Sequence, residues 1–111
     1  MRALVFGCLA LLSATTAAKA EARPDSAEWV LPGCQALISE GKSEPFKQGV
    51  CLGMTAAVSE MPGICVPGGM THEQSVRTVV RYIEARPAQA QERFIQLARE
   101  ALTAAWPCNK A

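Results

Sequence analysis

The chain has 111 residues, of which 50% are hydrophobic, and a formal net charge of +1 at pH 7. A chain of this length forms one domain, and its near-neutral charge excludes a basic nucleic-acid arm or a polybasic membrane patch. We therefore expect neither a nucleic-acid partner nor a membrane anchor on the mature chain.

The N-terminus has the order of features that is typical of a secretory signal peptide. Arg2 provides a positive charge, residues 3–12 form an apolar run, and small residues lead to the A-x-A site Ala18-Lys19-Ala20. The run is too short to cross a bilayer permanently, which takes about 20 residues. We predict a signal peptide over residues 1–20, cleaved after Ala20, and a mature periplasmic domain over residues 21–111.

The first expected helix begins soon after the cleavage site. Asp25 or Ser26 can cap its N-terminus, and Gly41 fits the left-handed position after its last turn. Its apolar residues are spaced for one helical face: Trp29, Val30, Cys34, Leu37 and Ile38.

Ser43 and Pro45 open a second helix, because proline is favoured at the first helical position. One face of this helix carries apolar residues four positions apart: Phe46, Val50, Met54 and Val58. A neighbouring row of small residues predicts close packing against another helix: Gly49, Gly53 and Ala57.

Residues 61–70 contain two prolines and three glycines, which predicts a loop. Thr71 then caps a third helix, and Gln74 completes a T-x-x-Q capping box. The third helix ends at Arg86-Pro87, because proline disfavours helical geometry in the residue before it. A fourth helix is expected from Ala88 to Trp106. The predicted fold class is therefore all-α: a small four-helix domain made of two helical hairpins.

Cysteine content predicts two disulfides. Of the five cysteines, Cys8 lies in the apolar run of the signal peptide, which leaves four in the mature chain: Cys34, Cys51, Cys65 and Cys108. An even number in a short exported chain indicates a disulfide framework. The paired C-x2-4-C spacing of a zinc site and the C-x-x-C of a redox motif are both absent from the sequence.

Four cysteines allow three pairings, and the spacing favours one of them. The first hairpin turns near Lys42, which brings Cys34 level with Cys51. The second turns at Arg86-Pro87, which brings Cys65 near Cys108 at its open end.

The sequence offers no catalytic constellation. His72 is the single histidine, and it stands at the start of the third helix without a nearby nucleophile and orienting acid. If all four mature cysteines are oxidised, no thiolate is available as a nucleophile. We find no metal or cofactor site and interpret the protein as one that acts by binding rather than as an enzyme.

Several short motifs resemble one known family. The order is Cys51-x-Gly53, then Cys65-x-Pro67 before a helix opened by Thr71, then Val79 to Ile83 followed by Pro87, and finally Trp106-Pro107-Cys108. This order resembles the Rap/Tai family of immunity proteins, which is associated with bacterial type VI secretion. The resemblance covers residues 34–108. It implies a small all-helical periplasmic protein, often a homodimer, that binds and blocks a peptidoglycan amidase injected by neighbouring cells.

The loop before the third helix is the candidate contact surface. It is the longest irregular stretch, and such segments often carry function on a rigid scaffold. The candidate partner contacts are Met61, Val66, Met70 and His72. Alternatively, these residues cap the open end of the bundle. Three other functions stay open: a periplasmic acid-stress chaperone, a general binding module without a toxin partner, and an enzyme, which the residues favour least.

Overall fold

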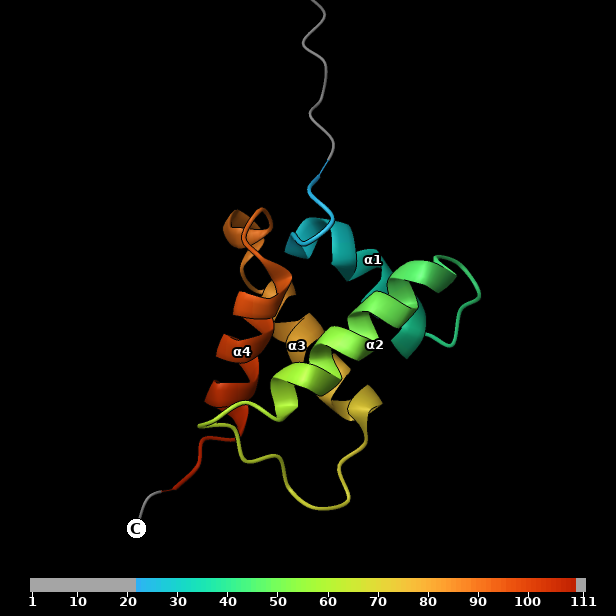
Figure 1. Cartoon of the computed structure of the whole chain (residues 1–111). Coiled ribbons are helices and arrows are strands. Elements are labelled where there is room, and N and C mark those ends of the chain that lie inside the picture. Colours follow the sequence, from blue (N-terminus) through green and yellow to red (C-terminus); the bar gives the residue numbers. More distant parts are fainter. Residues whose placement is uncertain (1–21, 110–111) are drawn as a thin grey trace, which may run out of the picture.

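The structure, a computed structural model, describes residues 22–109, so the predicted signal peptide lies outside the described residues. Within this range the chain forms four α-helices and one short 3-10 helix, and no strand longer than an isolated bridge (Figure 1). The elements are α1 (Ala27–Ile38), α2 (Pro45–Ser59), α3 (His72–Glu84), η1 (Pro87–Gln89) and α4 (Phe94–Ala105). The predicted all-α class is confirmed. None of these helices is both long and apolar enough to span a membrane.

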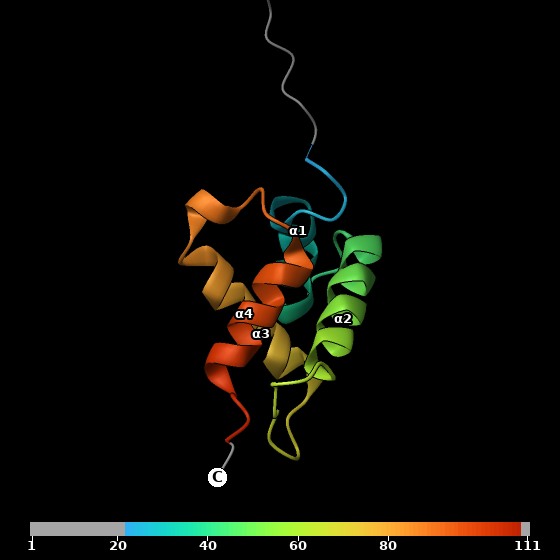
Figure 2. The same ribbon diagram turned by 60° about the vertical axis from the view of Figure 1, so that its left-hand side comes forward.

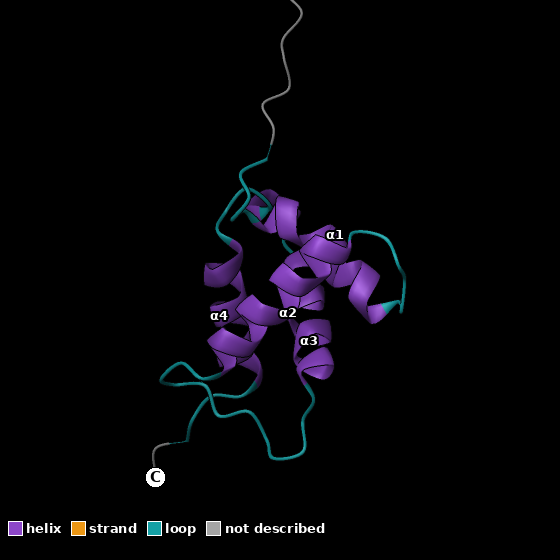
Figure 3. Cartoon of the chain, turned by 45° about the vertical axis from the view of Figure 1, so that its right-hand side comes forward, coloured by secondary structure: helices purple, strands orange, loops and turns teal. Residues whose placement is uncertain are grey.

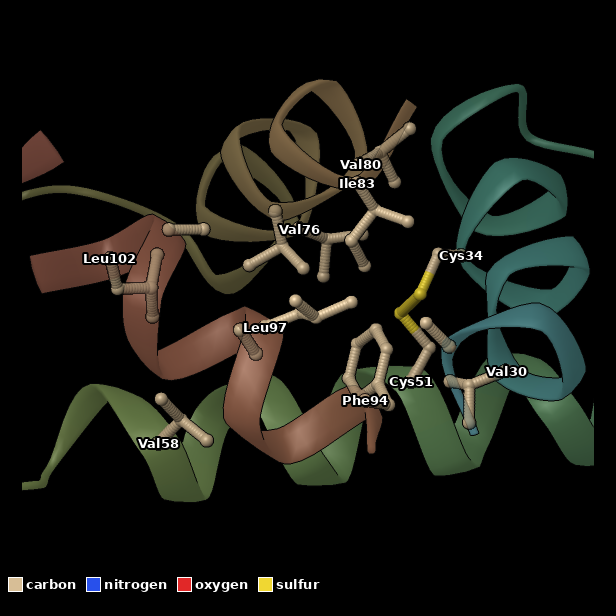
Figure 4. Packing of buried hydrophobic residues seen from close by; sticks show 14 of the residues in the cluster. Val30, Cys34, Cys51, Val58, Val76, Val80, Ile83, Phe94, Leu97 and Leu102 are labelled. Carbon is tan, nitrogen blue, oxygen red and sulfur yellow. A yellow bond between two sulfur atoms is a disulfide. The ribbon is translucent and has the colours of Figure 1, made fainter. Parts of the chain in front are cut away.

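The helices form two hairpins, α1 with α2 and α3 with α4, and each helix contacts the other three (Figure 2). The space between them is filled by one cluster of buried apolar side chains (Figure 4). Its largest fully buried members come from all four helices: Val30, Val58, Val76, Val79, Phe94, Leu97 and Leu102. Helices α3 and α4 supply five of these seven side chains.

Both predicted disulfides are present, with the favoured pairing. Cys34 and Cys51 join α1 to α2 with their Cα atoms 5.4 Å apart. Cys65 and Cys108 join the loop after α2 to the segment after α4, with a Cα separation of 5.0 Å. Figure 4 shows the first disulfide pointing into the same cluster as Phe94 and Leu97.

Helix α4 begins at Phe94, so the prediction of a helix from Ala88 is wrong. The chain between η1 and α4 is hydrogen-bonded to the start of α1 instead. The N–H groups of Ala27 and Glu28 donate to the carbonyls of Glu92 and Ala90, at 2.8 and 2.7 Å. A helix leaves its first N–H groups without internal partners, and here a distant segment supplies the acceptors. The Ser26 hydroxyl accepts from Trp29 N–H at 3.2 Å, which makes Ser26 the N-cap.

The end of α1 also differs from the prediction in one residue. The left-handed position is occupied by Glu40, with φ 57°, and not by Gly41. Gly41 N–H donates to the Ala36 carbonyl at 2.9 Å, and Glu40 N–H donates to the Leu37 carbonyl at 3.3 Å. These two bonds form a Schellman motif, in which glycine is the usual but not an obligatory left-handed residue.

The close approach of two helices occurs at Gly33 of α1. A Cβ atom added to Gly33 would overlap the main chain of Lys47 in α2. The predicted close packing at the small-residue row is wrong, because Gly49 and Gly53 face open space and are exposed. Helix α2 instead buries the neighbouring face, which consists of Cys51, Thr55 and Val58.

These two kinds of glycine predict opposite effects of substitution. Gly33→Ala should destabilise the fold by roughly 1–3 kcal/mol or more, because the added methyl group forces α1 away from α2. Gly53→Ala should stabilise it by about 0.5–1 kcal/mol, because alanine loses less backbone entropy in an exposed helix interior. Urea unfolding followed by circular dichroism measures both. Equal effects of the two substitutions would contradict this packing of α2.

Candidate partner-binding loop

The loop between α2 and α3, residues 60–71, lies at the end of the bundle where the chain leaves α4 (Figure 3). Ile64 is its buried anchor, with 7% of its surface exposed. Cys65 N–H donates to the Trp106 carbonyl at 2.9 Å, and Cys108 N–H donates to the Gly63 carbonyl at 3.3 Å. Together with the Cys65–Cys108 disulfide, these bonds attach the loop to the C-terminal segment.

Two turns shape the loop. Ile64 N–H bonds the Met61 carbonyl across Pro62-Gly63, and Met70 N–H bonds the Pro67 carbonyl across Gly68-Gly69. Gly63 and Gly69 have φ of 88° and 83°, as the third residue of a type II turn requires. The glycines that predicted a loop are therefore needed at two defined positions, and the loop has a specific shape.

The start of α3 fixes the far end of the loop. Gln74 N–H donates to the Thr71 hydroxyl at 3.2 Å, and Thr71 N–H donates to the Gln74 side-chain oxygen at 2.9 Å. The predicted capping box is thus confirmed. It places His72 as the exposed first residue of α3.

The loop brings three of the four predicted contact residues together. Val66, Met70 and His72 line an open pocket of about 450 Å³, together with Cys65 and the N-terminal turn of α3. Met61 is not among the lining residues. Met61 and Val66 are half-buried and pack against the core cluster, whereas Met70 is half-buried without joining it. Of the loop's two methionines, Met70 is therefore the one available to a partner.

Sequence reasoning missed a second surface, on α2. Phe46 is 74% exposed and Leu52 is 37% exposed, and they are the two large apolar side chains most exposed in the described chain. Lys47, the one charged residue within α2, turns toward α1, with its ammonium 4.7 Å from the centre of the Trp29 ring. The outer face of α2 is therefore uncharged. The absence of charge from residues 48–59 was the sequence signal for it.

Among the described residues no group of three potential metal-ligating side chains occurs. Burial and then the hydrogen bond to Glu100, at 3.1 Å, raise the pKa of the Tyr82 phenol on α3 above its ordinary value. A phenol with a raised pKa stays protonated near neutral pH, so Tyr82 is a structural hydrogen-bond donor.

The family model of the Rap1a immunity proteins matches residues 25–108, which include all four helices, the loop and both disulfides. The chain belongs to this family. The resemblance noted in the cysteine and proline motifs is thereby confirmed. No curated protein and no solved structure matches the chain. Membership of an immunity family supports an immunity function exerted on a partner effector protein.

The two methionines of the loop predict different outcomes when replaced by aspartate. Met61→Asp should destabilise the fold by roughly 1–3 kcal/mol, because it places a carboxylate against the apolar core. Met70→Asp should change stability by less than about 0.5 kcal/mol, because its side chain lies outside that core. Thermal unfolding at neutral pH compares the two. A large loss for Met70→Asp would mean that the loop serves to close the bundle.

Proposed function

We propose that this protein is a periplasmic immunity protein that binds and blocks a cell-wall amidase delivered by a neighbouring cell. Its membership of the Rap1a immunity proteins over residues 25–108 is the observation that carries the proposal. Two disulfides in one small domain agree with action in an oxidising compartment such as the periplasm. The protein itself need perform no chemistry, because occupying the entrance of an active site is enough to stop the enzyme.

The loop between α2 and α3 suits this role. A disulfide, two turns and a capping box fix its shape before binding. A preshaped loop loses little conformational entropy when it docks, so more of the contact energy appears as affinity. Met70 and His72 line the pocket, and a methionine side chain adapts to an irregular apolar cleft. We therefore place the occluding surface at Val66, Met70 and His72.

An inhibition assay tests the proposal. Amidases encoded beside this gene are the first candidates, captured by pull-down with the mature protein and assayed on purified peptidoglycan. The mature protein should abolish hydrolysis at near-stoichiometric concentration, and its secretion should rescue bacteria that express the amidase in their periplasm. Absence of binding to, and inhibition of, every adjacent amidase would contradict the proposal and favour a stress chaperone or a general binding module.

The same assay locates the contact surface. Met70→Asp should weaken inhibition at least about tenfold, because a carboxylate would be desolvated without a partner in the interface. Thr103→Asp is the matched control, since Thr103 is exposed on α4 and the substitution adds the same charge. If Met70→Asp leaves the inhibition constant within twofold, the occluding surface lies elsewhere.

The uncharged outer face of α2 supports a further proposal, that the protein forms a homodimer through this face. In a two-fold contact each surface meets its own copy, so a surface without charge avoids like-charge repulsion. The exposed backbone at Gly49 and Gly53 leaves room for a second helix, and Phe46 and Leu52 add apolar area at its edges. A single helix is about 22 Å long over 15 residues, which is small for an interface. The dimer should therefore dissociate on dilution.

Analytical ultracentrifugation over a range of concentrations tests the dimer. The wild type should change from monomer to dimer as concentration rises, and Leu52→Glu should stay monomeric, because the glutamate would face its own copy. Thr103→Glu, which adds the same charge on α4, should still dimerise. A wild type that stays monomeric at every concentration, or a Leu52→Glu variant that still dimerises, would refute this interface.

A further inference from the structure

The two disulfides differ in their access to solvent. Cys34 and Cys51 have no exposed surface and lie within the core cluster. Cys65 is exposed and Cys108 is half-buried, one residue before Asn109, the last described residue. Thiol–disulfide exchange requires in-line access of a thiolate to one sulfur. A soluble thiol can therefore reach the Cys65–Cys108 bond in the folded protein, while the helices shield the other bond.

The accessible disulfide also holds the proposed contact loop. Two hydrogen bonds connect the middle of the loop to another part of the chain. Cys65 N–H donates to the Trp106 carbonyl, and the Gly63 carbonyl accepts from Cys108 N–H. Both partners belong to the segment after α4. That segment leaves the bundle beyond Ala105 and is exposed at Pro107 and Asn109. Its polar and covalent connections to the loop are these two main-chain bonds, the Ile64–Pro107 bridge that they define and the disulfide. Ile64 and Trp106 also pack in the core cluster.

We infer that the Cys65–Cys108 disulfide is a redox lock on the contact loop, which is shaped for a partner when the bond is oxidised and released when a dithiol reduces it. The four-helix core stays folded through this change, because Cys34–Cys51 and the cluster members that belong to the helices remain in place. The consequence for amidase binding rests on the function proposed above. The consequence for the loop does not. In an oxidising compartment, exchange with an oxidised dithiol, which takes up the two electrons, would form the bond and make the protein competent to bind.

The chemistry is a two-electron exchange with a dithiol. A thiolate of the dithiol attacks the sulfur of Cys65, the exposed residue of the pair, forming a mixed disulfide and releasing Cys108 as a thiolate that takes up a proton. The second thiol of the reductant then attacks the mixed disulfide, which frees Cys65 as a thiol and leaves the reductant as an internal disulfide. Reduction also reopens a cross-link over 43 residues of sequence, so the freed loop and C-terminal segment gain conformational entropy.

Limited reduction of the folded mature protein tests the lock. The protein is treated with graded dithiothreitol, the free thiols are alkylated, and the labelled cysteines are identified by mass spectrometry. Cys65 and Cys108 should be labelled at least roughly tenfold faster than Cys34 and Cys51, because exchange follows access to the sulfur. Simultaneous labelling of all four cysteines, or earlier labelling of Cys34 and Cys51, would overturn the inference.

The structural effect is measured on the selectively reduced and alkylated protein. Helicity by circular dichroism should be retained, while hydrogen exchange at the Cys65 and Cys108 amides should accelerate at least about tenfold. The Val30 amide, bonded to the Ser26 carbonyl in α1 at 3.1 Å, serves as the internal control and should be unchanged. Unchanged exchange at Cys65 and Cys108 would show that the disulfide does not hold the loop.

Paired variants separate the roles of the two bonds without a reductant or an alkylated side chain. The double variant Cys65→Ser with Cys108→Ser should keep its helicity and show fast exchange in the loop. The double variant Cys34→Ala with Cys51→Ala should unfold at a lower temperature than the wild type. Below that temperature, the amides of its loop should exchange as slowly as in the wild type. The reverse pattern would overturn the inference.

Binding is read last, with the amidase captured by the oxidised protein. The selectively reduced protein should bind it at least about tenfold more weakly, and reoxidation should restore the affinity. If the oxidised protein captures no amidase, the proposed function has failed, and the labelling and exchange experiments still decide the lock. If an amidase binds equally well to both forms, the loop is released without consequence, and the redox control of binding is refuted.

Discussion

The close approach of α1 to α2 at Gly33 sets the orientation on which the rest of the structure depends. Because Gly33 has no side chain, the Lys47 main chain can lie against it, and the adjacent Cys34 reaches Cys51 one turn further along α2. This orientation turns Cys51 and its neighbours into the core. It also turns the small residues of α2, Gly53 among them, toward solvent. One contact between two main chains therefore decides both the buried and the exposed face of this helix.

The two ends of the bundle follow a common principle, in which distant segments satisfy main-chain groups that helices leave unpaired. At one end the residues before α4 accept hydrogen bonds from Ala27 and Glu28, at the start of α1. At the other end the segment after α4 accepts from Cys65 in the loop. Buried or half-buried N–H groups without partners are costly. Both ends of α4 therefore help to position elements that are far away in the sequence.

Features that depend on residues close in sequence, or on chain spacing, could be predicted well. The capping box of Thr71 and Gln74 needs one helical turn, and the disulfide pairing follows from two hairpins with symmetrical arms. The irregular chain before Phe94 could not be predicted, because its hydrogen-bond partners lie in α1 and its alanine and glutamine residues favour a helix on their own. Likewise, a row of small residues such as Gly53 marks a bare helix face without saying whether a neighbour covers it. Of the candidate site, the loop and its cysteines could be predicted from the sequence. The sequence did not show that Met61 packs against the core whereas Met70 does not.

The separation of the two cross-links explains how so small a domain can present a shaped loop without weakening its core. One disulfide lies among the buried apolar side chains and maintains the packing of α1 on α2. The other lies at the surface and joins two irregular segments that contribute Ile64 as a single deeply buried side chain. A partner-binding loop must differ in sequence from one recognition task to the next, whereas the packing beneath it must not. Because the proposed contact loop is attached largely by a covalent bond and by main-chain hydrogen bonds, side chains that do not pack in the core cluster, such as Met70 and His72, can vary while the four-helix scaffold is preserved.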